Sequence, residues 1–336
     1  MSFRILVTAP QLEPAGRALL EEAGCRLDFV APAGARPVME ALLAANPYEG
    51  VLSRSIPISG AAIASCPSLR VISRAAAGYD AIDLPAATAR GIPVLAAPGA
   101  NAQSVAEYTI GLIIAAARDI PRLDRATQAG GWERGTLGIE LHGRTLGLLG
   151  YGRIARGVAR IALAIGMRVL AWSPRLHQAG DIAPVERAAS VEDLLDRADI
   201  LSLHAPLNAA TRNIIDAVAL ARLGKEGILV NTARGGLVEE AALVAALREG
   251  RLRAAALDVR PTEPPPPELA LGEVPNLILT PHMGAATTVA RAATARAAAT
   301  HLLHALTGRP LPPGVCVNPE VLVRSDPSRQ EAASPR

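Results

Sequence analysis

Five ionisable residues follow short apolar segments of the kind that form buried β-strands. They are His204, Arg234, Asp258, Glu263 and His282. In an open parallel sheet the carboxyl ends of the strands meet at one edge, and ligands bind in the crevice beyond that edge. The sequence therefore predicts that these side chains lie at a common site.

Three of these residues, Arg234, Glu263 and His282, form a set that could oxidise a 2-hydroxy acid. Histidine accepts a hydroxyl proton near neutral pH, and a neighbouring carboxylate raises its pKa and orients the ring. Arginine binds a substrate carboxylate through two parallel hydrogen bonds. Each residue alone also has a structural interpretation, since Glu263 lies in a proline-rich segment that could be a linker. The reaction further requires a hydride acceptor.

A glycine-rich motif supplies a candidate site for that acceptor. Gly150, Gly152 and Ala155 match the pattern G-x-G-x-x-G/A, between a predicted strand at 145–149 and a predicted helix at 154–165. The first glycine permits a tight turn, and the second lets the backbone approach a pyrophosphate that lies on the helix N-terminus. The pattern alone is common, but its place between a strand and a helix predicts a dinucleotide site.

The residues after the second predicted strand of this region, at 168–172, bear on the choice of cofactor. An Asp or Glu there would bind the ribose 2′-hydroxyl of NAD. This chain has Ser173 and Arg175 instead. Both could bind a 2′-phosphate, and arginine does so through two hydrogen bonds. The sequence therefore favours NADP over NAD, although Arg175 could also be an ordinary surface residue.

Predicted strands and helices alternate along the chain, which indicates βαβ units and parallel sheets. The first series has strands at 5–8, 51–53, 71–73 and 94–96, and helices at 14–23, 59–65 and 85–89. The second series has strands at 145–149, 168–172, 200–204, 228–231, 254–258 and 277–280, and helices at 154–165, 190–196 and 239–249. Long helices at 103–118 and 287–307 flank the second series.

Composition excludes several classes of protein. The net charge over 336 residues is only +3, and the arginines are scattered, so we do not expect nucleic-acid binding. The one lysine, Lys225, lies in Gly-Lys-Glu and not in a phosphate-binding loop. No apolar run reaches the roughly 18 residues of a membrane span, and no signal peptide is evident. We expect a cytoplasmic location and no membrane partner.

Few residues suggest a metal site. The three cysteines are far apart and odd in number, which fits neither a disulfide framework nor a zinc site. His301 and His304 lie three residues apart on a predicted helix, but no third ligand is evident in the sequence. We expect both histidines to pack at the surface and predict no metal site.

Longer motifs carry a family likeness. They are Ser-Arg-Ala-Ala-Ala-Gly-Tyr-Asp-Ala-Ile-Asp at 73–83, Asn-Ala-Gln-Ser-Val-Ala-Glu-Tyr-Thr at 101–109, Asn-Thr-Ala-Arg-Gly-Gly at 231–236, Leu-Asp-Val at 257–259 with Glu-Pro at 263–264, and Thr-Pro-His-Met-Gly at 280–284. From about residue 51 to 288 the chain resembles the D-isomer-specific 2-hydroxyacid dehydrogenases, which include phosphoglycerate dehydrogenase and glyoxylate/hydroxypyruvate reductases.

The resemblance implies an α/β fold with two doubly wound parallel-sheet domains. A dinucleotide-binding Rossmann domain at 101–285 would be inserted into a discontinuous, flavodoxin-like substrate (catalytic) domain at 1–100 and 286–320. Residues 321–336 would form a flexible tail. The resemblance also implies a homodimer that associates through the cofactor domain.

The resemblance further assigns roles to residues. His282 would be the acid/base, Glu263 its partner and Arg234 the group that binds the substrate carboxylate. Backbone amides near Ala77 and Gly78 would hold the other end of the substrate, and Arg54 is a weaker candidate. The expected cofactor-binding residues, from the motif and the resemblance together, are Gly150, Tyr151, Gly152, Arg153, Ile154, Ser173, Arg175, His204, Pro206, Thr232, Ala233, Asp258 and Gly284.

We therefore expect an NAD(P)H-dependent oxidoreductase that reversibly reduces a small 2-keto acid resembling glyoxylate or hydroxypyruvate. Two alternative activities are 3-phosphoglycerate dehydrogenase and phosphite dehydrogenase. Glu263 argues against formate dehydrogenases, which resemble this family but have Gln in that role. With about 30 residues after the last long helix, we expect no regulatory C-terminal domain. An alternative of another class is a non-catalytic, NAD(H)-sensing protein like the C-terminal-binding-protein corepressors.

Overall fold

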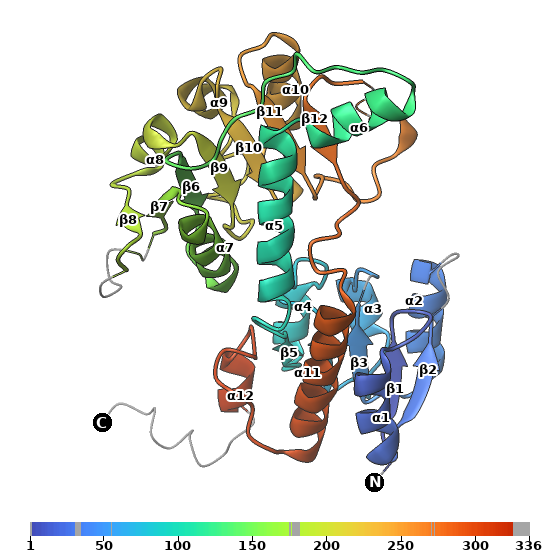
Figure 1. The fold of residues 1–336 in the computed structure, drawn as a ribbon. Helices are drawn as coiled ribbons and strands as arrows, with labels where there is room; N and C mark the ends of the chain where they lie inside the picture. The colour runs from blue at the N-terminus through green and yellow to red at the C-terminus, as the bar shows by residue number, and fades with distance from the viewer. Residues whose placement is uncertain are drawn as a thin grey trace, which may run out of the picture. The chain divides into compact units, whose positions relative to one another are not determined.

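The computed structural model describes residues 2–30, 35–54, 56–174, 176, 182–269, 271 and 273–324. The chain divides into two compact units (Figure 1). The first unit comprises the residues up to Asn101 and those from Thr287 onward, and the second comprises Ala102–Ala286. Within the described part of the chain, no helix is both long enough and apolar enough to cross a membrane.

The first unit is built on a sheet of five parallel strands in the order β2-β1-β3-β4-β5. This is the flavodoxin-like order. The strands are β1 Arg4–Val7, β2 Arg26–Phe29, β3 Gly50–Ser53, β4 Val71–Arg74 and β5 Val94–Leu95. The helices are α1 Pro14–Glu22, α2 Ala35–Ala45, α3 Gly60–Ala64, α4 Leu84–Ala89, α11 Thr288–Thr307 and α12 Glu320–Arg324.

Both faces of this sheet are covered, because successive side chains of a strand point to opposite faces. In β1, Leu6 belongs to a core cluster that includes Met39 of α2 and Ile63 of α3. Its neighbours Ile5 and Val7 belong to a second cluster, formed with α1 and α11. Figure 1 shows α1 and α11 side by side. The run of three apolar residues at 5–7 in this strand follows from burial on both faces.

The second unit has a sheet of seven parallel strands in the order β12-β11-β10-β9-β6-β7-β8. Its strands β6 to β11 have the order of a dinucleotide-binding fold, and β12 is added beside β11 at one edge. The strands are β6 Thr145–Leu149, β7 Arg168–Trp172, β8 Glu186–Arg187, β9 Ile200–Leu203, β10 Ile228–Asn231, β11 Ala254–Leu257 and β12 Leu277–Leu279.

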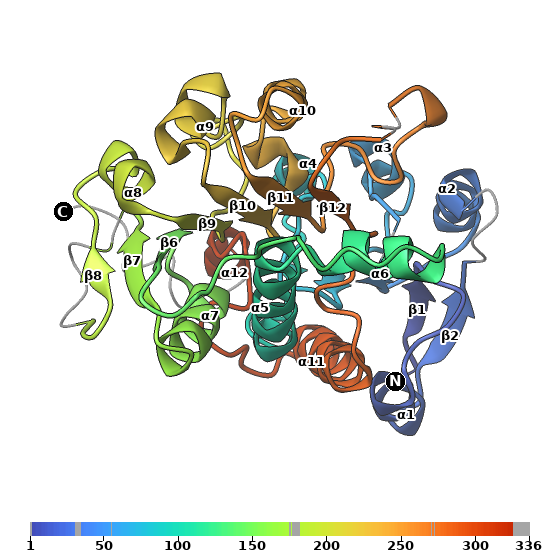
Figure 2. The same ribbon diagram turned by 45° about the horizontal axis from the view of Figure 1, so that its top comes forward.

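Helices cover both faces of the seven-stranded sheet, as Figure 2 shows. One core cluster joins the sheet to α5 Ala102–Ala117 and α7 Arg153–Ala164. The other joins it to α8 Val191–Arg197, α9 Ala217–Leu223 and α10 Glu240–Arg248. The remaining elements of this unit are α6 Ile120–Gln128 and two short 3-10 helices, η2 Gly235–Leu237 and η3 Pro267–Leu269.

The predicted fold class, with two doubly wound parallel sheets, is confirmed. Several elements were not predicted, namely β2, α2, α6, β8 and α9. The prediction of a tail at 321–336 was wrong at its start, because residues up to Arg324 form α12 and Val321 is 2% exposed. Residues 325–336 lie outside the described part of the chain.

Candidate active site

The glycine-rich turn connects β6 to α7 as the motif predicts. Gly150 has a φ angle of 94°, and an added Cβ atom would lie 2.7 Å from the carbonyl group of His204. Glycine is therefore required here both by backbone conformation and by space. The turn is fixed by its own amide, because Gly150 N–H donates to Trp172 O at 2.8 Å.

The next glycine has a different environment. An added Cβ atom at Gly152 would meet no protein atom within 4 Å, and Gly152 precedes the first helical residue of α7, Arg153. The N-terminus of a helix presents backbone N–H groups and a partial positive charge to an anion. A turn that has no Cβ atom at Gly152 and open space beside it, at this end of a 12-residue helix, fits the pyrophosphate of a dinucleotide.

This turn lies at the point where the order of the sheet reverses. β6 pairs with β7 on one side and with β9 on the other, so the chain leaves β6 and β9 in opposite directions. Ligands of open α/β sheets bind in the crevice at such a point. His204, just after β9, is next to the turn and its Nε2 lies 2.9 Å from Ser202 Oγ. Burial lowers the pKa of His204 to about 4, which keeps the ring neutral at neutral pH.

The remaining predicted cofactor residues follow the strands at the same edge of the sheet. Tyr151 and Ile154 pack partly against the core, while Arg153 and Pro206 are exposed. Ser173 directly follows β7 and is partly buried, but Arg175 lies outside the described residues. Of these two residues the structure therefore places Ser173, at the carboxyl end of β7.

A buried asparagine shapes the turn that carries Arg234. Asn231 ends β10, and its Nδ2 donates to Arg234 O at 2.9 Å while its Oδ1 accepts from Ala233 N–H at 3.0 Å. Thr232 is tied to α5, because its hydroxyl lies 2.8 Å from that of Thr109. Asn231 was not among the predicted site residues, although a polar residue at the end of an apolar strand is a usable signal.

The Arg234 turn is pressed against the segment that carries Glu263. An added Cβ atom at Gly235 would lie 1.9 Å from the carbonyl carbon of Arg260, which no side chain allows. The Arg234 guanidinium donates to Ala233 O at 2.7 Å. Arg234 and the segment that begins at Arg260 are therefore held at a fixed separation by backbone contact.

His282 and Glu263 form a direct contact. The Nδ1 atom of His282 lies 2.6 Å from Glu263 Oε2, and Arg260 N–H donates to Glu263 Oε1 at 2.9 Å. The hydrogen bond to Glu263 raises the pKa of His282. Burial acts to raise the pKa of Glu263, but the hydrogen bonds from His282 and Arg260 lower it overall. The pair therefore stabilises the charged imidazolium, and the second ring nitrogen, Nε2, is the one available for proton transfer.

The turn that presents His282 is anchored by a buried carboxylate. Asp258 is 1% exposed and accepts from the hydroxyl of Thr280 at 2.7 Å and from the amides of Met283 and Gly284 at 2.7 and 2.8 Å. The amide of His282 donates to the backbone oxygen of Asp258 at 2.8 Å. These bonds hold His282 at a φ of 58°, a left-handed conformation that is rare outside glycine.

The predicted catalytic set therefore comes together at one edge of the second unit. A cavity of about 400 Å³ lies beside the acid/base pair. It is lined by Asp258, Arg260, Glu263, Pro264, Pro265, Leu279, Thr280, Pro281 and His282. Arg234 is close enough to lower the pKa of both His282 and Glu263 by its charge.

The predicted substrate residues outside this set lie in the first unit, after the ends of its strands. Arg54 follows β3, where its amide donates to Thr8 Oγ1 at 2.9 Å. Its guanidinium lies 3.8 Å from Glu13 Oε1. Ala77 and Gly78 follow β4, and Arg74 donates to Gly78 O at 2.5 Å. The loop at 75–78 is thus held by the last residue of its own strand.

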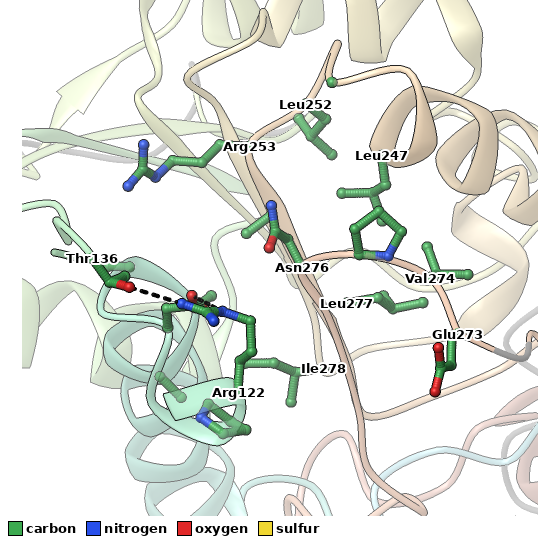
Figure 3. Close-up of a pocket in the computed structure, with 18 of the residues that line it drawn as sticks. Arg122, Thr136, Leu247, Leu252, Arg253, Glu273, Val274, Asn276, Leu277 and Ile278 are labelled. Carbon is green, nitrogen blue, oxygen red and sulfur yellow. Dashed lines mark hydrogen bonds and ion pairs between the residues drawn. The ribbon is translucent and has the colours of Figure 1, made fainter. Parts of the chain in front are cut away.

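A larger cavity of about 820 Å³ lies at the opposite, amino-terminal edge of the seven-stranded sheet (Figure 3). Arg122, Arg253 and Asn276 are among its lining residues, and Arg122 donates to Thr136 Oγ1 at 3.0 Å. Ligands of this fold bind at the carboxyl edge. The large cavity is therefore separate from the candidate active site.

One of the two helical histidines does not pack as predicted. His301 is 8% exposed, and its Nδ1 lies 3.1 Å from Ala96 O. His304 is less buried, and its Nδ1 lies 2.8 Å from Pro310 O. The expectation of surface packing was therefore wrong for His301, because α11 covers a face of the first sheet. Across the described residues there is no cluster of three or more His, Cys, Asp and Glu that could hold a metal ion.

Comparison with known proteins identifies the family. The pattern that defines the D-isomer specific 2-hydroxyacid dehydrogenase, NAD binding domain, matches residues 110–284. A D-3-phosphoglycerate dehydrogenase of Methanocaldococcus jannaschii is 40% identical over 307 residues, which are 91% of this chain and 58% of that protein. A glyoxylate reductase of Thermofilum pendens is 39% identical over 264 residues, or 77% of each chain.

A solved structure agrees. The NADPH-dependent glyoxylate/hydroxypyruvate reductase of Sinorhizobium meliloti, in complex with NADP and malonate, superposes with a TM-score of 0.79 at 30% identity. The match covers 90% of this chain and 93% of that one. The chain belongs to the D-isomer specific 2-hydroxyacid dehydrogenase family. It spans about three fifths of the length of the curated phosphoglycerate dehydrogenases that it matches.

Proposed function

We propose that this protein is an NAD(P)H-dependent D-2-hydroxyacid dehydrogenase that reversibly reduces a small 2-keto acid. The observation that carries the proposal is the contact of 2.6 Å between His282 Nδ1 and Glu263 Oε2. Nδ1 is engaged by the carboxylate, so Nε2 of His282 donates the proton to the keto oxygen during reduction and removes it during oxidation. Glu263 stabilises the imidazolium from which that proton leaves.

Arg234 binds the substrate carboxylate in this proposal. Its turn is fixed by Asn231 and by the close packing of Gly235 on Arg260, so its position relative to the acid/base pair is set before substrate binds. A guanidinium forms two parallel hydrogen bonds with a carboxylate and thereby orients it. The charged imidazolium and Arg234 together stabilise negative charge on the substrate as the keto group is reduced.

The second unit serves as the cofactor domain and the first as the substrate domain. A bound nicotinamide cofactor supplies or accepts the hydride. Gly150, Gly152 and the N-terminus of α7 would hold its pyrophosphate, and Thr232, Ala233 and Asp258 its nicotinamide end. Three of the roughly four acceptor positions of the Asp258 carboxylate are already filled, which leaves one for an amide donor.

We propose NADP as the preferred cofactor and a small unphosphorylated keto acid, such as glyoxylate or hydroxypyruvate, as the substrate. Ser173 stands where an acidic residue would repel a 2′-phosphate, and the neighbouring Arg175 is a donor for it. The Sinorhizobium meliloti relative is described as NADPH-dependent. Arg54 and Arg74 are the candidate phosphate-binding residues, and both already have partners, which favours an unphosphorylated substrate.

We further propose a homodimer formed through the second unit. Trp132 and Leu137, in the segment between α6 and β6, are 78% and 84% exposed. Exposed apolar patches mark contact surfaces, and these two side chains are the candidates for such a patch in the second unit. Light scattering on wild type and on a Trp132→Ser, Leu137→Ser double variant tests the assignment. A dimer that persists in the double variant would place the contact elsewhere.

The reaction itself is tested by the absorbance of reduced nicotinamide. Purified protein is mixed with NADPH or NADH and with glyoxylate, hydroxypyruvate, pyruvate, a longer keto acid or 3-phosphohydroxypyruvate. Oxidation of NADPH with a small unphosphorylated acid is expected. Preference for 3-phosphohydroxypyruvate or for NADH would overturn the corresponding part of the proposal. Tight cofactor binding without turnover on any keto acid would favour phosphite oxidation or a non-catalytic sensor.

A further inference from the structure

An ion pair is formed by Arg260, the residue whose amide binds Glu263. Arg260 donates from Nε to Glu240 Oε2 and from Nη2 to Glu240 Oε1, the latter at 2.7 Å. The two side chains are 11% and 19% exposed. Arg260 Nη2 also donates to Leu269 O at 2.8 Å. A bidentate pair of this kind has a fixed geometry, unlike a single contact between flexible side chains.

Glu240 is a rigid anchor for this pair. It is the first residue of α10, whose Leu243, Ala246 and Leu247 are buried in the core against the seven-stranded sheet. A carboxylate at the N-terminus of a helix is also favoured by the helix dipole. The position of the Arg260 guanidinium is therefore set by an element of the core and not by the loop that carries Arg260.

The backbone of Arg260 contacts the carboxylate of Glu263, so the position of Arg260 affects that of Glu263. Its N–H donates to Glu263 Oε1 at 2.9 Å, and the other oxygen of Glu263 lies 2.6 Å from His282 Nδ1. Its carbonyl group is packed on Gly235, the neighbour of Arg234. The backbone of Arg260 is therefore held in place by two contacts, the ion pair of its side chain with Glu240 and the packing of its carbonyl group on Gly235.

We propose that Glu240 and Arg260 are positioning residues that hold the carboxylate of Glu263 against His282. This inference rests on the proposed function, in which His282 is the acid/base. Neither side chain needs to touch substrate or cofactor for this role. Without the ion pair, the segment 260–263 would lose its connection to α10, and the Arg260 amide would no longer hold Glu263 in one orientation.

The charges that face His282 determine how its pKa would change if Glu263 were displaced. Glu263 and Asp258 favour the charged ring, and Arg234 opposes it. The hydrogen bond to Glu263 is the largest of these influences on the pKa of His282. Since reduction needs the protonated ring, a displaced Glu263 moves the alkaline loss of activity to lower pH.

The test compares Glu240→Gln with Glu249→Gln, which makes the same change at an exposed ion pair with Arg251 at the other end of α10. In Glu240→Gln we expect kcat/KM for keto-acid reduction to fall about tenfold, and its alkaline midpoint to fall by about half a pH unit. Cofactor Kd should change less than about twofold. Glu249→Gln should match wild type in all three measurements.

A second pair of variants separates geometry from charge. Arg260→Lys keeps the positive charge but cannot form the two parallel hydrogen bonds with Glu240. Arg260→Met removes both the charge and these hydrogen bonds. We expect Arg260→Lys to recover part of the activity that Arg260→Met loses, and its midpoint to lie between that of Arg260→Met and wild type. A role confined to general stability would lower the melting temperature and the activity but leave the midpoint unchanged, and that result would overturn the inference.

The imidazole titration of His282 gives a readout that does not need turnover. It is followed by nuclear magnetic resonance in the cofactor-free protein, with the His282 signals assigned from their loss in His282→Gln. If no keto acid is reduced by wild type but the His282 midpoint falls in Glu240→Gln, the proposed function fails and the positioning role stands. If wild type is active and neither midpoint moves in the folded Glu240→Gln or Arg260→Lys variants, the positioning role is wrong.

Discussion

The Nδ1 atom of His282 lies 2.6 Å from Oε2 of Glu263, although the two residues are separated by 18 others in the sequence. Two different strands bring them together, since Glu263 follows β11 and His282 follows β12, its neighbour in the sheet. The carboxylate contacts one ring nitrogen, and the other, Nε2, is the one that exchanges the proton in the proposed reaction. The contact with Glu263 therefore determines which nitrogen of His282 exchanges the proton.

The first prediction concerns pH. Glu263 raises the pKa of His282, so reduction is fast below the raised pKa and is lost as the pH rises through it, while oxidation gains over the same range. In Glu263→Gln the pKa falls, and the alkaline loss of reduction should move down by about one pH unit or more. The measurement is kcat/KM for the keto acid against pH. His282→Gln, as the reference, should lose about 10²-fold or more in kcat.

A midpoint that stays in place in Glu263→Gln would mean that another group controls the pH dependence. The cofactor Kd distinguishes this from damage to the fold, because Gly150 and Gly152 lie on a different turn from Glu263. It should remain within about twofold of wild type in both variants.

The second prediction concerns Arg234. Arg234→Lys keeps the positive charge but loses the planar fork, so it binds a carboxylate less specifically. We expect KM for the keto acid to rise about tenfold or more and cofactor Kd to stay unchanged. Steady-state kinetics and a fluorescence titration measure the two quantities. An unchanged KM would show that another cation binds the carboxylate, and Arg54 would be the next residue to replace.

The glycine turn and the strand-end residues were predictable because they depend on local rules. Gly150 and Gly152 are separated by one residue, and their predicted roles follow from the missing Cβ atom, which permits the tight turn at the first and a close backbone approach at the second. His204, Arg234, Asp258 and His282 each follow an apolar strand, so the geometry of a parallel sheet places them at one edge without any knowledge of loop structure. The resemblance to known dehydrogenases then assigned roles to these positions.

Other features depend on contacts that no local pattern encodes. β2 was missed because it is a short edge strand in which Arg26 and Asp28 leave only two apolar residues, so that its pairing with β1 identifies it. The pair of Arg260 and Glu240 joins a loop to a helix that precedes it by 20 residues. Such contacts follow from tertiary packing.

The third prediction separates two glycines of one turn. An alanine at Gly150 would have a φ of 94° and a Cβ atom 2.7 Å from the His204 backbone, so Gly150→Ala should lower the free energy of unfolding by about 2 kcal/mol or more. An alanine at Gly152 meets no protein atom within 4 Å, so Gly152→Ala should leave that free energy within about 0.5 kcal/mol of wild type.

Gly152→Ala should weaken cofactor binding even though it leaves the free energy of unfolding unchanged. Its added methyl group occupies the space through which the backbone approaches the pyrophosphate, so we expect Kd to rise about tenfold although the protein is fully folded. Denaturant unfolding and calorimetric titration measure the two effects. Wild-type affinity in Gly152→Ala would place the pyrophosphate away from this turn.

The last prediction concerns the hydroxyl of Thr280, which donates at 2.7 Å to the carboxylate of Asp258. Thr280→Val keeps the shape of the side chain and removes this donor from a carboxylate that is 1% exposed. A buried charged acceptor that loses a partner costs about 1–3 kcal/mol. The same change loosens the turn that holds His282 at its left-handed φ, so kcat should fall about tenfold while KM changes little. Thr280→Ser restores the donor and should restore both the free energy of unfolding and kcat.

Thr307→Val is the matched control for this prediction. It removes an exposed hydroxyl that donates to Leu303 O at 2.7 Å, and it should change the free energy of unfolding by less than about 0.5 kcal/mol. Wild-type kcat in a destabilised Thr280→Val would show that the amides of Met283 and Gly284 hold the turn without the hydroxyl.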